Sequence, residues 1–111
     1  MVSTLLDSLS DHLIHFYKER YTECEQQLKK LRKERNEIAD EYETNLNRYR
    51  ALITLESRIS SDEEHFDKQD KSWFQYNIGV IKKEIGKYWR ELQIVDYRIS
   101  IIENEIDALR I

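Results

Sequence analysis

Two histidines and a glutamate near the start of the chain have the types and spacing for metal chemistry. His12 and His15 stand three residues apart, and Glu19 follows His15 by four. On a helix all three can face one side, where imidazole and carboxylate groups bind zinc. The glutamate between the two histidines of a metallohydrolase motif is absent, and the sequence makes no fourth ligand evident. We interpret these side chains as a solvated helix surface and expect neither a metal nor another cofactor.

The only cysteine, Cys24, lacks the setting of a catalytic nucleophile. No histidine stands four residues from it to act as a base, and its position in the row of apolar residues at coiled-coil spacing in the first half predicts a small buried thiol. The chain also lacks a glycine-rich phosphate loop. We therefore expect a protein that is not an enzyme. A single cysteine excludes an intramolecular disulfide and favours a reducing compartment.

The one basic cluster, residues 29–35, reads Lys-Lys-Leu-Arg-Lys-Glu-Arg. A basic helix can lie along nucleic-acid phosphates or an anionic membrane. Acidic residues on neighbouring turns, including Glu25 and Glu37, favour a solvated face with pairs four residues apart. Binding to nucleic acid or membrane is therefore only our second alternative.

Ser60 and Ser61 precede the acidic run Asp62-Glu63-Glu64. A serine three residues before a glutamate is a capping box, which satisfies free amides where a helix starts. The same letters resemble an acid-directed kinase target, so both serines are candidate phosphosites. Phosphate at a helix start would strengthen the cap.

The composition favours long solvated helices. The 111 residues contain no proline and two glycines, and 36% of them are charged. Turn-rich β-sandwiches need more glycine and proline than this. The net charge of -4 mixes both signs, and no apolar run is long enough for a membrane helix. We expect an intracellular protein, cytoplasmic or nuclear, without a transmembrane segment.

The second half has apolar residues spaced alternately by four and three, the pattern of a coiled coil. We call these positions the second seam. They are Phe74, Ile78, Ile81, Ile85, Tyr88, Leu92, Val95, Ile99, Ile102, Ile106 and Leu109.

The first half has a weaker seam, interrupted by Arg35, Asn45 and Glu56, which fits a particular partner better than itself. This first seam runs through Ile14, Tyr17, Tyr21, Cys24, Leu28, Leu31, Arg35, Ile38, Tyr42, Asn45, Tyr49, Leu52, Glu56 and Ile59. Upstream, Leu6, Leu9, Leu13 and Phe16 lie one residue out of its frame.

The two seams do not share one frame, so we predict a break near residue 60. One helical unit, residues 1–111, would contain a helix over about 4–58, a loop over about 59–65 and a helix over about 63–110. We favour an all-α antiparallel coiled-coil hairpin within a larger helical assembly. One continuous helix is the other architecture. In the hairpin, Leu52 lies opposite either Ile78 or Lys71, and we prefer Ile78 because the Lys71 register opposes Glu56 to Asp67.

The second helix also has apolar residues outside its seam, and a helix with a wide apolar face is contacted from more than one side. We predict that these residues bind a partner: Trp73, Tyr76, Val80, Trp89, Ile94, Tyr97 and Ile101. Gly79 and Gly86 stand seven apart, and a close approach of another backbone would compensate for their cost.

These features predict a non-catalytic coiled-coil subunit or scaffold that binds one or more partner helices through an extended apolar face. In architecture it resembles short helical subunits of kinetochore, vesicle-tethering and autophagy assemblies. A homo-oligomeric coiled-coil spacer is the first alternative.

Overall fold

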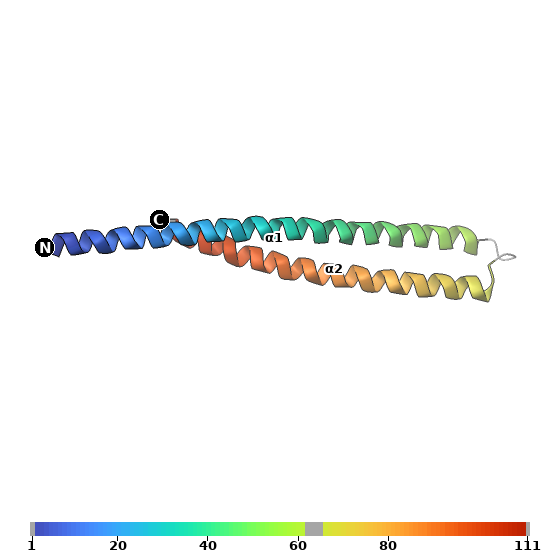
Figure 1. The fold of residues 1–111 in the computed structure, drawn as a ribbon. Helices are drawn as coiled ribbons and strands as arrows, with labels where there is room; N and C mark the ends of the chain where they lie inside the picture. Colours follow the sequence, from blue (N-terminus) through green and yellow to red (C-terminus); the bar gives the residue numbers. More distant parts are fainter. Residues whose placement is uncertain (1, 62–65, 111) are drawn as a thin grey trace. The chain divides into compact units, whose positions relative to one another are not determined.

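The protein is a hairpin of two long helices (Figure 1). The computed structural model describes residues 2–61 and 66–110, with side chains from residue 8 onward. Helix α1 spans Val2–Ser60 and helix α2 spans Lys68–Leu109, and the two pack against each other. The predicted all-α hairpin is therefore confirmed, and the alternative of one continuous helix is wrong.

The hairpin divides into two compact units, each built from a stretch of both helices. The terminal unit comprises Met1–Glu34 and Val95–Ile111, and the loop unit comprises Arg35–Ile94. Each unit thus needs its own contacts between α1 and α2.

The terminal unit holds its helices together with a continuous apolar core. Its buried residues are Cys24, Leu28, Val95, Ile99 and Ile106. Two ion pairs cross between the helices beside this core, Arg20 with Glu105 and Arg32 with Glu103. The core residues come from both seams, as coiled-coil packing requires.

The loop unit buries less of its seam. Among its described residues only Phe74 and Asn45 are buried, while Tyr42, Tyr49 and Leu52 are half-buried. Phe66 lies 6.2 Å from Phe74 between ring centroids. The Asn45 side-chain amide donates a 2.9 Å hydrogen bond to the Glu41 carbonyl of its own helix.

The helix register in the loop unit agrees with the one that places Leu52 opposite Ile78. The Lys82 ammonium lies 5.9 Å from the centroid of the Tyr49 ring. Ile53, next to Leu52, lines the same groove as Ile78. The alternative register, with Leu52 opposite Lys71, would move α2 by seven residues, or about 10 Å, along α1.

Helix α2 begins at Lys68, later than the predicted start at about residue 63. Asp67 caps it, because the Asp67 carboxylate accepts a 2.9 Å hydrogen bond from the Asp70 amide. The Asp70 carboxylate in turn accepts a 3.4 Å bond from the Asp67 amide. This reciprocal pair is a capping box made of two aspartates.

Ser60 and Ser61 do not cap a helix start through their hydroxyls. The Ser60 hydroxyl donates to the Ser57 carbonyl at 3.3 Å, and the Ser61 hydroxyl donates to the Arg58 carbonyl at 2.7 Å. Both serine hydroxyls therefore bond carbonyl groups in the last turn of α1. Their predicted capping partners, Glu63 and Glu64, lie outside the described residues.

Candidate protein-binding surfaces

The seam positions and the outer positions of α2 differ in exposure. Every second-seam residue from Phe74 to Leu109 is buried or half-buried. The first-seam residues are likewise buried or half-buried from Tyr21 to Ile59, whereas Ile14 and Tyr17 are exposed. The seams therefore form the contact between the helices wherever both helices are present.

All seven residues predicted to bind a partner have exposed side chains. Five belong to the loop unit, where Trp73 is 53% exposed and Tyr76 is 72% exposed. The loop-unit members are Trp73, Tyr76, Val80, Trp89 and Ile94. Tyr97 and Ile101 belong to the terminal unit. Their role in binding stays a prediction, but no contact with α1 hides them from solvent.

A groove in the loop unit lies between the second half of α1 and the first half of α2. Ile53, Ile78 and Phe66 give it apolar walls, and Lys71 and Lys82 give it cationic ones. Its other lining residues are Glu56, Ser60, Gln75 and Gly79. Sequence reasoning missed Ile53 and Phe66, because each stands outside the regular frame of its seam.

Gly79 and Gly86 have open space around them. A methyl group built on either residue would meet nothing within 4 Å beyond its own chain neighbours and helix backbone. The expected close approach is therefore not made by this chain among its described residues. The two glycines instead leave bare backbone on one flank of α2, where a second helix can come near.

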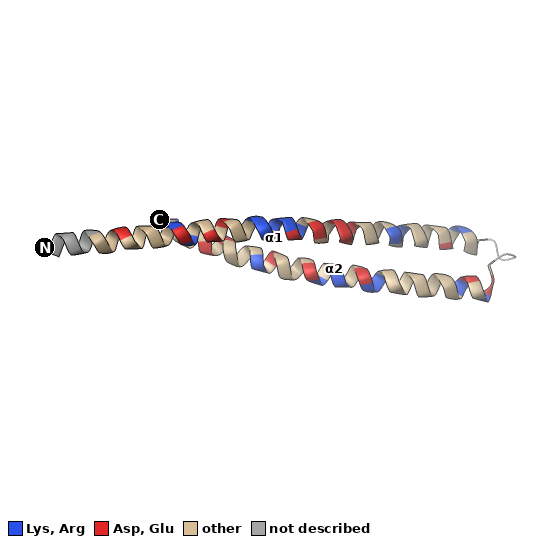
Figure 2. Ribbon diagram, viewed as in Figure 1, with Lys and Arg blue, Asp and Glu red and all other residues tan. Residues whose placement is uncertain are grey.

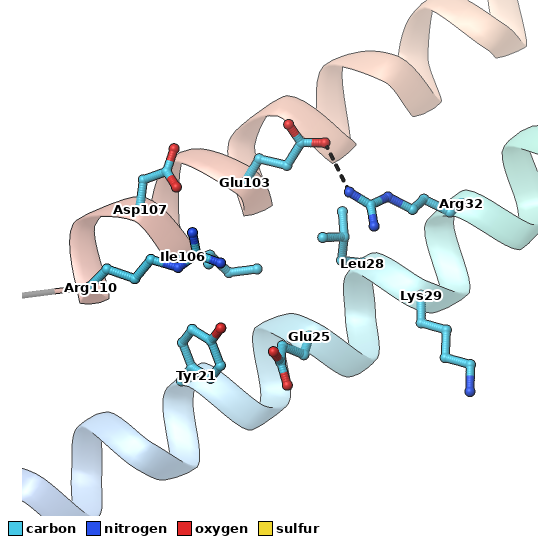
Figure 3. A pocket seen from close by; sticks show the side chains of 9 residues that line it. All are labelled: Tyr21, Glu25, Leu28, Lys29, Arg32, Glu103, Ile106, Asp107 and Arg110. Carbon is cyan, nitrogen blue, oxygen red and sulfur yellow. Dashed lines mark ion pairs between the residues drawn. The ribbon is translucent and has the colours of Figure 1, made fainter.

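A second groove lies in the terminal unit and carries both signs of charge (Figure 3). Arg32 forms a 3.5 Å ion pair with Glu103 across the helices. Contact with the Tyr21 hydroxyl raises the pKa of the Arg110 guanidinium. The groove is lined by Tyr21, Glu25, Leu28, Lys29, Arg32, Glu103, Ile106, Asp107 and Arg110. Its mixed charges do not favour a ligand of one sign.

The basic cluster of α1, residues 29–35, borders this second groove. Figure 2 shows its blue turns on α1 between turns that carry acidic residues. Lys29 and Arg32 line the groove, and Arg32 is paired with an acid on α2. Part of the cluster thus faces acidic side chains of the same chain, which weakens its attraction for phosphates.

Cys24 is fully buried next to the ion pair of Arg20 and Glu105. It is 0% exposed, and burial raises the pKa of its thiol, with the Glu105 charge adding to the effect. The Arg20 guanidinium donates to Glu105 at 2.6 Å, and this bond raises the pKa of Arg20. A protonated, inaccessible thiol is a poor nucleophile and suits a structural role.

His12 and His15 are both exposed on α1. The His15 imidazole lies 2.9 Å from the Glu19 carboxylate, one turn away. Within residues 8–61 and 66–110, no three His, Cys, Asp or Glu side chains are arranged to hold a metal ion. The geometry here is a surface pair on one helix.

The start of α1 presents apolar side chains that α2 does not cover. Every residue from Ser8 to Glu19 is exposed, including Leu13 at 57% and Phe16 at 60%. In Figure 1 the blue start of α1 extends beyond the red end of α2. Leu6, the first member of this stripe, has a side chain outside the described ones.

None of the described helices combines the length and apolar character needed to cross a bilayer. Searches among protein-family models, curated proteins and solved structures gave no match to this chain.

Proposed function

We propose that the chain is a non-catalytic helical scaffold that binds a partner helix along the loop unit. The supporting observation is the contrast within that unit between few buried residues and many large exposed apolar ones. Contiguous exposed apolar surface marks interaction sites. Tryptophan and tyrosine, which contribute strongly to binding energy at interfaces, are among the exposed residues.

The groove of the loop unit sets the geometry of this contact on the flank of the seam that carries Trp89, whereas Trp73, Val80 and Ile94 share a heptad position on the other flank. Gly79 and Lys82 line it, and Gly86 and Trp89 follow them by two helical turns on α2. A partner helix along this flank would approach the bare backbone at both glycines. It would also pack against the exposed ring of Trp89. This is recognition of an amphipathic helix by a groove.

The charges of α2 favour acidic flanks on the partner helix. Among the residues that the structure describes, the groove is lined by Lys71 and Lys82 and by one acid, Glu56. Along the same part of α2 the charged residues are Lys68, Lys71, Lys82, Lys83, Lys87 and Arg90 against Asp70, Glu84 and Glu91. Electrostatic complementarity of this kind directs partner choice and the rate of association.

Blocking the groove tests the proposal. Replacing Gly79 and Gly86 together by leucine fills the flank without removing a charge, whereas Thr44→Leu adds an exposed leucine elsewhere on the loop unit. The tagged full chain and both variants are compared by quantitative affinity capture from native lysate. We expect a captured protein that the double glycine variant loses and Thr44→Leu retains.

The site of contact is then read from a zero-length carbodiimide cross-linker, which joins lysine amines to carboxylates. We expect cross-links from Lys71 and Lys82 to acidic residues of one helical segment in the captured protein. Capture that the glycine variant does not change, or cross-links confined to other lysines, would refute the proposed groove.

A further inference from the structure

We propose that an acid-directed serine kinase phosphorylates Ser60, and that the phosphate closes the groove of the loop unit to an acidic partner helix. The closing of the groove rests on the proposed function. The contact between the phosphate and the groove does not, because both belong to this chain.

The sequence after Ser60 fits kinases that select an acid three residues beyond the serine. Glu63 stands at that position, and Ser61 has a glutamate at the same distance. Both serines are exposed at the end of α1, so a kinase needs to open only the last helical turn to reach them. The other serines with an acid at this distance, Ser8 and Ser100, stand inside α1 and α2. The motif and the fold therefore favour the pair near residue 60.

Position in the groove distinguishes Ser60 from Ser61. Ser60 lines the groove of the loop unit together with Lys71 and Lys82. Ser61 is not among the lining residues within the described part of the chain. A phosphate on Ser60 is therefore attached to the wall of the groove, whereas a phosphate on Ser61 is attached outside it.

A phosphate on Ser60 reverses the charge of the groove. The described lining residues include two lysines and one carboxylate, so the lining is positive without the phosphate. Phosphoserine adds a charge of about −1.5 to −2 at neutral pH, which makes the lining negative. The acidic flanks that the lysines favour on a partner helix are then repelled.

The end of α1 directs the phosphate toward the lysines. The Ser60 hydroxyl donates a 3.3 Å hydrogen bond to the Ser57 carbonyl, and a fully ionised phosphate has no proton with which to keep that bond. The negative end of the helix dipole also repels the phosphate. Lys71 and Lys82 offer charge-assisted hydrogen bonds in the same groove, so the phosphate links the end of α1 to α2.

The modification takes its phosphoryl group from ATP. A bond forms between Ser60 Oγ and the γ-phosphorus, and the bond from that phosphorus to the oxygen it shares with the β-phosphate breaks. ADP leaves with that oxygen, and the serine proton passes to a base of the kinase.

Two singly modified chains test the contact without any partner. Full-length Ser61→Ala and Ser60→Ala are each treated with ATP and a purified acid-directed serine kinase, and tandem mass spectrometry locates the phosphate. The chains phosphorylated only at the remaining serine of the pair are then purified. The Ser61 phosphate is the matched control, because it also adds negative charge at the end of α1.

Phosphorus magnetic resonance then follows the second ionisation of each phosphate, whose ordinary pKa is about 6. We expect this pKa to be at least about 0.5 lower for phosphate on Ser60 than on Ser61, because the ammonium groups of Lys71 and Lys82 stabilise the dianion. Lys71→Gln combined with Lys82→Gln should remove the difference.

Quantitative capture from native lysate with phosphatase inhibitors tests the closing of the groove. The readout is the protein that the double glycine variant loses. Phosphate on Ser60 should reduce its capture at least about tenfold relative to unmodified Ser61→Ala, because the groove then repels acidic flanks. Phosphate on Ser61 should leave capture equal to that of unmodified Ser60→Ala.

Absence of phosphate on Ser60, equal phosphate pKa values in the two chains, or equal capture by both phosphorylated chains would each overturn the inference. If no captured protein depends on Gly79 and Gly86, the proposed function fails, and the closing of the groove fails with it. The pKa difference between the two chains then still decides whether the phosphate contacts the lysines.

Discussion

The terminal and loop units use the same two helices but bury their seams to different depths. Among the residues whose side chains are described, the terminal unit has five buried apolar residues, whereas the loop unit has Phe74 and the polar Asn45. The terminal unit also places Arg20 and Arg32 in ion pairs across the helices. Stability should therefore be concentrated in the terminal unit.

The composition of the seams explains this difference. Cys24 and Leu28 are compact and close-packed, but the loop unit fills equivalent positions with Tyr42, Tyr49 and Glu56. Tyrosine hydroxyls and carboxylates keep their polar ends near water, which prevents full burial. The large apolar residues on the outside of the loop unit are not buried by the described residues of this chain.

The largest expected effect is the difference between matched core truncations. Ile99→Ala in the terminal unit should reduce the free energy of unfolding by about 3 kcal/mol, because a buried isoleucine is replaced by a cavity. Ile85→Ala, at a half-buried position in the loop unit, should cost about half as much. Urea unfolding followed by circular dichroism measures both. A greater loss with Ile85→Ala would reverse the comparison.

Thiol reactivity provides a second test of the two units. Cys24 should react with an aromatic disulfide reagent about a hundredfold more slowly than a thiol at a half-buried seam position, because it must wait for local opening. The matched protein carries Ile81→Cys together with Cys24→Ala. Equal rates in the two folded proteins would show that the terminal unit opens as readily as the loop unit.

The same thiol should make stability depend on pH. Folding raises the pKa of Cys24 above its ordinary value of 9.0, so the neutral thiol favours the folded state below that pH. As the pH rises from the pKa of the thiol in the unfolded chain toward its higher pKa in the folded protein, this contribution to stability is lost. Wild-type stability should therefore fall more steeply above pH 9.0 than that of Cys24→Ala, as measured by urea unfolding. Parallel curves would contradict the assigned cause.

The glycines of the loop unit should give a smaller effect of opposite sign. Gly79→Ala and Gly86→Ala should each stabilise the free chain by about 0.5–1 kcal/mol, because alanine favours helix and the added methyl group meets open space. Thermal unfolding measures the gain. Destabilisation would reveal a close neighbour in the free protein, and the proposed partner should bind both variants more weakly.

The smallest effect concerns the Arg20–Glu105 ion pair. Its side chains are 35% and 33% exposed, so solvent weakens the pair. A double-mutant cycle with Arg20→Met and Glu105→Gln should show a weak favourable coupling that declines as salt is added. A strong coupling that does not change with salt would mean that this pair, rather than the apolar core, stabilises the terminal unit.

The hairpin could be predicted because the order of apolar residues shows two coiled-coil seams that do not share one frame, which indicates two helices. The same spacing could not show where α2 begins. Ser60 and Ser61 offered capping boxes as plausible as the one that Asp67 and Asp70 form. Which cap is used depends on the path between the helices, and local propensity does not encode that path.

The sequence also predicted the exposed apolar residues of α2, because they stand outside the coiled-coil spacing of the seam. The groove of the loop unit could not be predicted from the sequence, because Ile53 and Phe66 line it only once one helix packs on the other.

The structure also changes the expected effect of a phosphate group on Ser60 or Ser61. These hydroxyls bond carbonyls at the end of α1, where added negative charge opposes the helix dipole. Phosphorylation should loosen the last turn of α1, not strengthen a cap.

Asn45 has a consequence for adaptability. A buried asparagine that bonds across a coiled coil locks two helices at one level. The Asn45 amide instead bonds the Glu41 carbonyl of its own helix, so sliding α2 along α1 would not break that bond. Alignment in this stretch then depends on the shapes of the packed side chains, which permit small shifts of one helix along the other.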